Sequence, residues 1–102
     1  MEEVKVLGMQ NGVLEIALFG DIDLGNAETF FETVITEYKK MPTDIHFNCE
    51  NLNFIDSTTL GTFVKILKQA QANGHAVKLT GLQAKIKKLF LICSLDTIME
   101  IA

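Results

Sequence analysis

Apolar residues follow two different periods along this chain, and the order of these periods limits the fold more than any other feature. Strand-like runs cover residues 4–7, 13–19, 45–49 and 76–79, and a short apolar piece covers residues 52–55, whereas helix-like spacings of three and four cover residues 26–40, 57–72 and 82–92. Asn11-Gly12 favours a tight hairpin between the first two strands. Strands that alternate with helices need crossover connections and therefore run parallel. The sequence predicts one α/β domain over residues 1–102, with a mixed, mostly parallel sheet of four to five strands and three main helices in the order β-β-α-β-α-β-α.

The patterns also predict which side chains face the core. Strict alternation over residues 45–49 turns His46 toward solvent or a thinly covered sheet face, and a short turn is expected at Glu50-Asn51. Residues 94–97 are expected to form a turn or a helical stub, followed by an extended piece over residues 98–101. Leu91 and Ile92 lie off the main apolar stripe of the last helix, and we expect that tail to cover them; if they are exposed, they offer a docking patch. The residues expected to face inward on the last two helices are Leu60, Phe63, Val64, Leu67, Leu82, Ile86, Leu89 and Phe90.

Charge is distributed unevenly. Residues 1–60 hold eleven acidic and three basic side chains, which gives −8, and residues 61–102 hold two acidic and six basic ones, which gives +4. All nine basic residues are lysines. Arginine is the usual side chain for bidentate contacts to phosphates and bases, so nucleic-acid binding is not expected. The lysines of residues 85–88 form a solvated helix face or a docking surface.

Other residue types give little sign of catalysis or metal binding. Cys49 and Cys93 both lie in apolar patterns, and we expect buried, reduced thiols. His46 and His75 have no nearby partner at metal-ligand spacing, so no metal site and no cofactor are predicted. The first residues lack the basic start and apolar core of a signal peptide, and no apolar run is long enough to span a bilayer. A cytoplasmic protein is the default expectation.

The segment Phe54–Gly61 places a carboxylate and three hydroxyls where a strand ends and a helix begins: Asp56, Ser57, Thr58 and Thr59. The first backbone N–H groups of a helix lack intrahelical partners, and the helix dipole favours negative charge there. A hydroxyl at this point is well sited to carry a phosphate. The simpler interpretation is that Asp56 or Ser57 is only the helix N-cap.

Three segments of the chain resemble the STAS domain family, specifically the bacterial anti-sigma factor antagonists. They are Gly20-Asp21-Ile22-Asp23 with Ala27–Phe30, then Phe47–Ser57, and a frame made of Leu60-Gly61, Asn73-Gly74 and Lys85–Phe90. The resemblance extends over nearly the whole chain, and the middle segment is the most specific.

The resemblance implies a function and a site. The partners would be a serine kinase that is also the anti-sigma factor, and a serine phosphatase. The unphosphorylated antagonist would bind the kinase and free the sigma factor, and phosphorylation would end that binding. The acceptor maps onto Ser57, with Thr58 and Thr59 as alternative acceptors. The partner-binding residues map onto Asp21, Asp23, Asp56, Ser57, Thr58, Thr59 and Gly61.

One position departs from the family pattern, because Thr59 stands where the family usually has glycine. A β-branched side chain there is expected to narrow the space through which a partner approaches the acceptor. This keeps open a second interpretation, a STAS module that is not phosphorylated and serves as a scaffold or as a subunit of a transport assembly. An enzyme with Ser57 as nucleophile is not expected, because neither histidine lies where it could act as the base. The oligomeric state is left open by the sequence.

Overall fold

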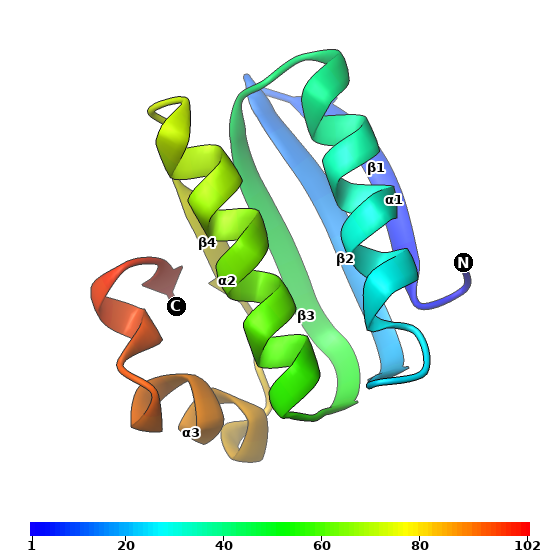
Figure 1. The fold of residues 1–102 in the computed structure, drawn as a ribbon, viewed down its shortest axis with the longest axis vertical. Coiled ribbons are helices and arrows are strands. Elements are labelled where there is room, and N and C mark those ends of the chain that lie inside the picture. The colour runs from blue at the N-terminus through cyan, green and yellow to red at the C-terminus, as the bar shows by residue number, and fades with distance from the viewer.

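Strands and helices follow one another in the predicted order in the computed structural model, which describes residues 1–102 (Figure 1). The strands are β1 (Val4–Gln10), β2 (Val13–Ile22), β3 (Asp44–Ile55), β4 (Val77–Thr80) and β5 (Glu100–Ile101). The helices are α1 (Ala27–Lys40), α2 (Ser57–Ala72) and α3 (Ala84–Ile92), and a 3-10 turn, η1 (Leu95–Thr97), precedes β5. None of the helices has both the length and the apolarity that crossing a bilayer requires.

The five strands lie side by side in chain order. β1 and β2 form the predicted antiparallel hairpin, and Asn11 and Gly12 at its turn have φ angles of 54° and 77°. Two-residue hairpin turns need such positive φ values, which Asn-Gly adopts readily. β2, β3, β4 and β5 are parallel neighbours. The carboxyl ends of β2, β3 and β4 therefore share one end of the molecule, called here the carboxyl end, where the three helices begin.

The core lies between one face of the sheet and helices α1 and α2 (Figure 1). Four phenylalanines at its centre contact one another edge to face, with ring centroids 5.2 to 6.0 Å apart: Phe30, Phe47, Phe63 and Phe90. This geometry is favourable for aromatic pairs beyond the area they bury. On α2 the predicted core residues Phe63 and Leu67 are buried, whereas Leu60 and Val64 are half-buried at the edge of the core.

The predicted turn at Glu50-Asn51 is wrong, because β3 continues without a break to Ile55. The strand absorbs two extra residues relative to β2. Ala17 pairs with Asn48 but Phe19 with Asn51, and a second shift follows two residues later. Such bulges bend a strand and change which side chains face the core. As a result the buried residues Leu52 and Ile55 lie three apart, and the alternation that identifies a strand is lost.

The C-terminal part differs from the prediction in its packing. α3 begins at Ala84 instead of Leu82, and Leu89, expected in the core, is 37% exposed. Ser94 has a φ of 57° and turns the chain so that Leu95 and Met99 become the buried residues of the tail. The tail therefore leaves Leu91 and Ile92 uncovered.

The two cysteines also differ from each other. Cys49 is buried as predicted, and burial raises the pKa of its thiol to about 12. Cys93 at the end of α3 is exposed, which contradicts the expectation of a second buried thiol. The turn at Ser94 accounts for this, since it leads the tail away from the end of the helix.

Candidate functional site

The site proposed from the sequence lies at the carboxyl end of the sheet, where β3 passes into α2 (Figure 1). Asp56 is the N-cap of α2, with the extended backbone typical of that position. Its Oδ1 accepts a hydrogen bond from the backbone N–H of Thr59 at 3.0 Å, and the Thr59 hydroxyl oxygen lies 3.1 Å from the same Oδ1. The capping interpretation is therefore confirmed for Asp56, and Ser57 is the first helical residue.

The same carboxylate fastens a second segment to the helix. Its Oδ2 accepts a hydrogen bond from the backbone N–H of Leu24 at 2.9 Å, across 32 positions of sequence. Asp56 therefore joins the β2–α1 loop to the first turn of α2. The β2–α1 loop and the α2 N-terminus form one surface for this reason.

The β2–α1 loop is held in shape by its own polar side chains. The Asn26 Oδ1 accepts from the Asp23 N–H at 2.8 Å, and the Asn26 Nδ2 donates to the Asp21 carbonyl at 3.0 Å. The Asp23 Oδ1 accepts from the Gly25 N–H at 2.9 Å. Local bonds of this kind stabilise a turn without regular secondary structure. Asp21 at the end of β2 is exposed and Asp23 in the loop is half-buried, and both carboxylates lie at the end of the sheet where α2 begins.

The hydrogen bonds lower the pKa of Asp56 below its ordinary value. The largest cause is the bond from the Thr59 backbone N–H, and the bond from the Leu24 N–H acts in the same direction. Donors aimed at a carboxylate stabilise its charged form. Asp56 is therefore ionised at neutral pH, and the site carries a fixed negative charge beside Ser57.

The three hydroxyls that follow Asp56 have different surroundings. Ser57 and Thr58 are exposed, and so is Gly61 one turn further on. Thr59 is fully buried at 0% exposure, and its hydroxyl donates to the backbone carbonyl of Ile22 at the end of β2. A kinase or a binding partner therefore cannot reach the Thr59 hydroxyl. This rules out Thr59 as an alternative phosphate acceptor and as a partner-binding residue. The side chain points into the protein, so the expectation that it narrows the approach to Ser57 is wrong.

Two apolar residues at this end were not identified from the sequence. Leu24 is 75% exposed at the tip of the β2–α1 loop, and Phe54 is 46% exposed near the end of β3. Phe54 pairs in register with Asp21. Exposed side chains of this size beside polar groups are typical of protein interaction sites. The bulges in β3 decide the exposure of Phe54, and no periodicity in the residues of β3 indicates them.

Neither histidine lies at this site. The His75 Nδ1 is hydrogen-bonded to the Tyr38 hydroxyl at 2.7 Å, after the C-terminus of α2. His46 lies on the sheet face opposite the helices, as predicted, and its ring nitrogens contact Glu15 at 2.6 Å and the Thr80 hydroxyl at 2.7 Å. Ser57 therefore has no histidine beside it.

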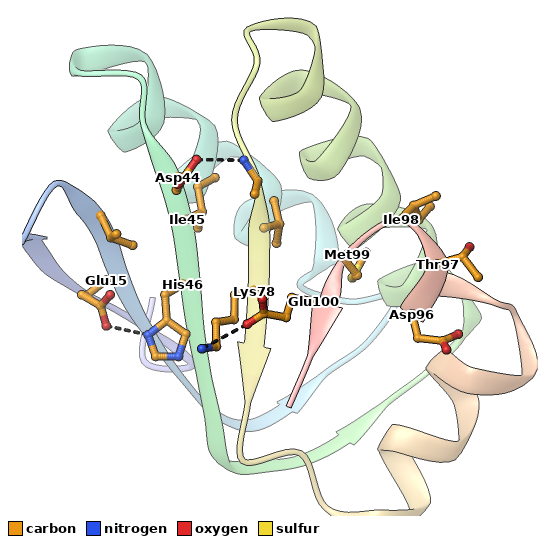
Figure 2. A pocket seen from close by; sticks show the side chains of 13 residues that line it. Glu15, Asp44, Ile45, His46, Lys78, Asp96, Thr97, Ile98, Met99 and Glu100 are labelled. Atoms are coloured by element: carbon orange, nitrogen blue, oxygen red, sulfur yellow. Dashed lines mark hydrogen bonds and ion pairs between the residues drawn. The ribbon is translucent and has the colours of Figure 1, made fainter.

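His46 lines a cavity of about 630 Å³ between β2, β3, β4 and the tail (Figure 2). Most polar side chains that line this cavity form hydrogen bonds or ion pairs with one another or with the backbone. Figure 2 shows His46 directed at Glu15 and Lys78 directed at Glu100, and Lys78 and Glu100 form an ion pair at 3.1 Å. Asp44 accepts from the Ala76 N–H at 2.9 Å. This cavity is lined by polar side chains that pair with one another or with the backbone, and it lies away from Ser57.

Comparison with known proteins identifies the family of this fold. The family model described as "STAS domain" matches residues 6–102. An anti-sigma-B factor antagonist of Staphylococcus aureus (strain NCTC 8325) is 32% identical over 93 residues, which cover 90% of this chain and 85% of that protein. A proposed anti-sigma factor antagonist of Thermotoga maritima has a similar structure, with 25% identity, a TM-score of 0.85, and coverage of 96% of this chain and 82% of that one.

The fold is also that of the Bacillus cell fate determinant SpoIIAA in its phosphorylated form. The two share 23% identity and a TM-score of 0.77, with coverage of 97% of this chain and 90% of that one. These matches extend over almost the entire sheet and all three helices. The chain belongs to the STAS domain family and, within it, to the anti-sigma factor antagonists.

Proposed function

We propose that this protein is a phosphorylation-switched binding module, which binds a serine-kinase anti-sigma factor when Ser57 is free and releases it when Ser57 is phosphorylated. The observation that carries the proposal is the exposed Ser57 in the first turn of α2, directly after the N-cap Asp56. The antagonist name of the Staphylococcus aureus relative supports the class of partner. A serine phosphatase would restore the binding form.

The position of Ser57 suits a phosphate that leaves the fold intact. The N-terminus of a helix favours negative charge, so a phosphate there is tolerated by the domain itself. The fixed charges of Asp56 and the nearby loop already make this end acidic. Phosphate adds a further charge of about −1.5 to −2 at neutral pH.

The switch then acts on the partner by charge repulsion. Two like unit charges about 6 Å apart repel by roughly 3 kcal/mol at an effective dielectric constant of about 20, and salt reduces this at a surface. A partner carboxylate placed near Ser57 would experience a repulsion of this size. Since about 1.4 kcal/mol corresponds to a tenfold change in Kd, the affinity falls about ten- to hundredfold. The domain need not change its conformation.

Mass spectrometry tests the modification. The protein is purified from its native host, or incubated with candidate host kinases and ATP, and the intact mass and the modified residue are determined. We expect a single phosphate on Ser57 and none in a Ser57→Ala variant. A phosphate on Thr58 would move the acceptor by one residue and keep the mechanism. Absence of phosphate under every condition would favour the scaffold interpretation.

Titration calorimetry with the cognate kinase tests the binding switch. Ser57→Glu is expected to weaken binding about tenfold or more, whereas Ser57→Ala keeps it. Thr36→Glu is the matched control, because Thr36 is also exposed on a helix and the substitution adds the same charge away from the carboxyl end. Equal binding by wild type and a folded Ser57→Glu variant would refute the mechanism.

A further inference from the structure

Helix α3 presents an outward surface that the fold itself does not use. Its exposed apolar residues are Leu89 at 37%, Leu91 at 45% and Ile92 at 68% exposure. Lys85 and Lys88 are exposed on the same helix. We call these five residues the α3 surface. Several aliphatic side chains exposed on one helix leave apolar area in contact with water. Such a patch, bordered by polar residues, is typical of a protein interaction site.

No acidic group of the protein neutralises this surface. The ion pairs of the molecule involve Lys40 with Glu37 and Lys78 with Glu100, and no carboxylate lies within 4.0 Å of a lysine of α3. The helix itself contains no acidic residue. In a chain of net charge −4, the α3 surface is therefore a local positive patch with apolar residues.

The α3 surface is held rigidly in place. Ile86 and Phe90 on the inner side of the helix are buried, and the Phe90 ring contacts Phe63 of α2 with centroids 5.3 Å apart. At the start of the helix the Gln83 Nε2 donates to the Asn53 Oδ1 at 3.1 Å, three residues before the N-cap of α2. A pre-ordered surface loses little conformational entropy when it binds.

Helix α3 begins at the same end of the molecule as the Ser57 site. β2, β3 and β4 are parallel, so the loop after β2, the α2 N-terminus after β3 and α3 after β4 all lie at the carboxyl end. Figure 1 shows the first turn of α2 between the β2–α1 loop and α3. A partner that covers Ser57 therefore meets an acidic loop on one side and the basic, apolar α3 surface on the other.

We propose that the α3 surface is a second contact for the partner that binds at Ser57, and that the partner presents acidic and apolar side chains to it. This inference rests on the proposed function. A partner that is repelled by phosphate on Ser57 carries negative charge at this end of the molecule. Lysines beside the switch attract that charge, and the aliphatic residues supply the apolar contact that gives an interface its affinity. Contacts at the α3 surface make binding favourable. The phosphate on Ser57 opposes binding because it repels the negative charge of the partner.

Binding to the cognate kinase with paired variants tests this proposal. The double variant Lys85→Glu, Lys88→Glu is expected to weaken binding at least about tenfold, mainly by slowing association, and to reduce its salt dependence. Ile92→Ser is expected to weaken binding about tenfold by faster dissociation. All substituted side chains are exposed, so the unfolding midpoints should stay near that of wild type.

The matched controls make the same kinds of substitution, lysine to glutamate and an exposed aliphatic residue to serine, at positions outside α3. Lys5→Glu with Lys39→Glu alters the net charge equally, and Leu7→Ser removes an apolar side chain that is 44% exposed on β1. Both controls are expected to bind like wild type. If Ser57→Glu abolishes binding but the α3 variants do not, the inference is overturned and the proposed function stands. If wild type binds no host kinase, the proposed function fails first. An effect confined to self-association or to anionic vesicles would assign the surface to another partner and overturn the inference.

Discussion

Thr59→Val is the substitution that most directly tests how the site is built. The two side chains have nearly the same shape, so the change removes the hydroxyl and little else. In the wild type that hydroxyl is fully buried, donates to the Ile22 carbonyl and lies 3.1 Å from the Asp56 Oδ1. The variant leaves the Ile22 carbonyl without this donor in a place closed to water, whereas the Asp56 Oδ1 keeps its hydrogen bond from the Thr59 N–H.

The expected loss follows from the cost of an unmade buried hydrogen bond, about 1 to 3 kcal/mol. A loss of about 2 kcal/mol lowers the urea midpoint by roughly 1.3 M if m is about 1.5 kcal/mol/M. The same loss lowers Tm by about 8 to 16 °C in a domain of this size. Because valine and threonine have similar helix propensities, the helix itself contributes little to the difference.

Urea unfolding followed by circular dichroism measures the effect, with Thr58→Val as the matched control. Thr58 is exposed one position earlier in the same turn, so the identical chemical change there should alter stability by no more than about 0.5 kcal/mol. Hydrogen exchange gives an independent readout, since a loosened Asp56 should also expose the Leu24 amide. Equal midpoints for the two variants would show that the buried bond does not hold the α2 N-terminus to β2.

Two further predictions concern titration and thiol chemistry. Because the folded-state pKa of Asp56 is lowered, its contribution to stability is complete above the unfolded-state pKa of about 3.9 and is lost as the pH falls through the folded value. Urea midpoints measured across this acidic range should therefore fall less steeply in Asp56→Asn, and parallel curves would contradict the assignment. A thiol reagent at neutral pH should modify Cys93 rapidly and Cys49 only on unfolding, since Cys49 is buried with a pKa raised to about 12. Two fast thiols in the native protein would disprove the buried position of Cys49.

Local patterns in the chain were sufficient for most of the fold. The three-and-four spacing over residues 57–72 predicted α2 with the bounds that the structure has, and Asn11-Gly12 predicted the hairpin. The polar residues before the helical run predicted an N-cap at Asp56 or Ser57, and the structure assigns it to Asp56. These features depend on residues within one helical turn or one hairpin, because capping and turn conformation are determined by residues that are close in the sequence.

Contacts between distant segments were decided only by the tertiary structure. The pairing of β2 with β3 introduced the bulges that keep β3 extended to Ile55, and no periodicity within β3 records them. The same pairing brings the Ile22 carbonyl to the Thr59 hydroxyl across 37 positions, which buries a residue expected at the surface. The turn at Ser94 leaves Leu91 and Ile92 exposed beside lysines. Local sequence set where the helices and strands form, whereas burial and surface character depended on which partners the folded chain placed against them.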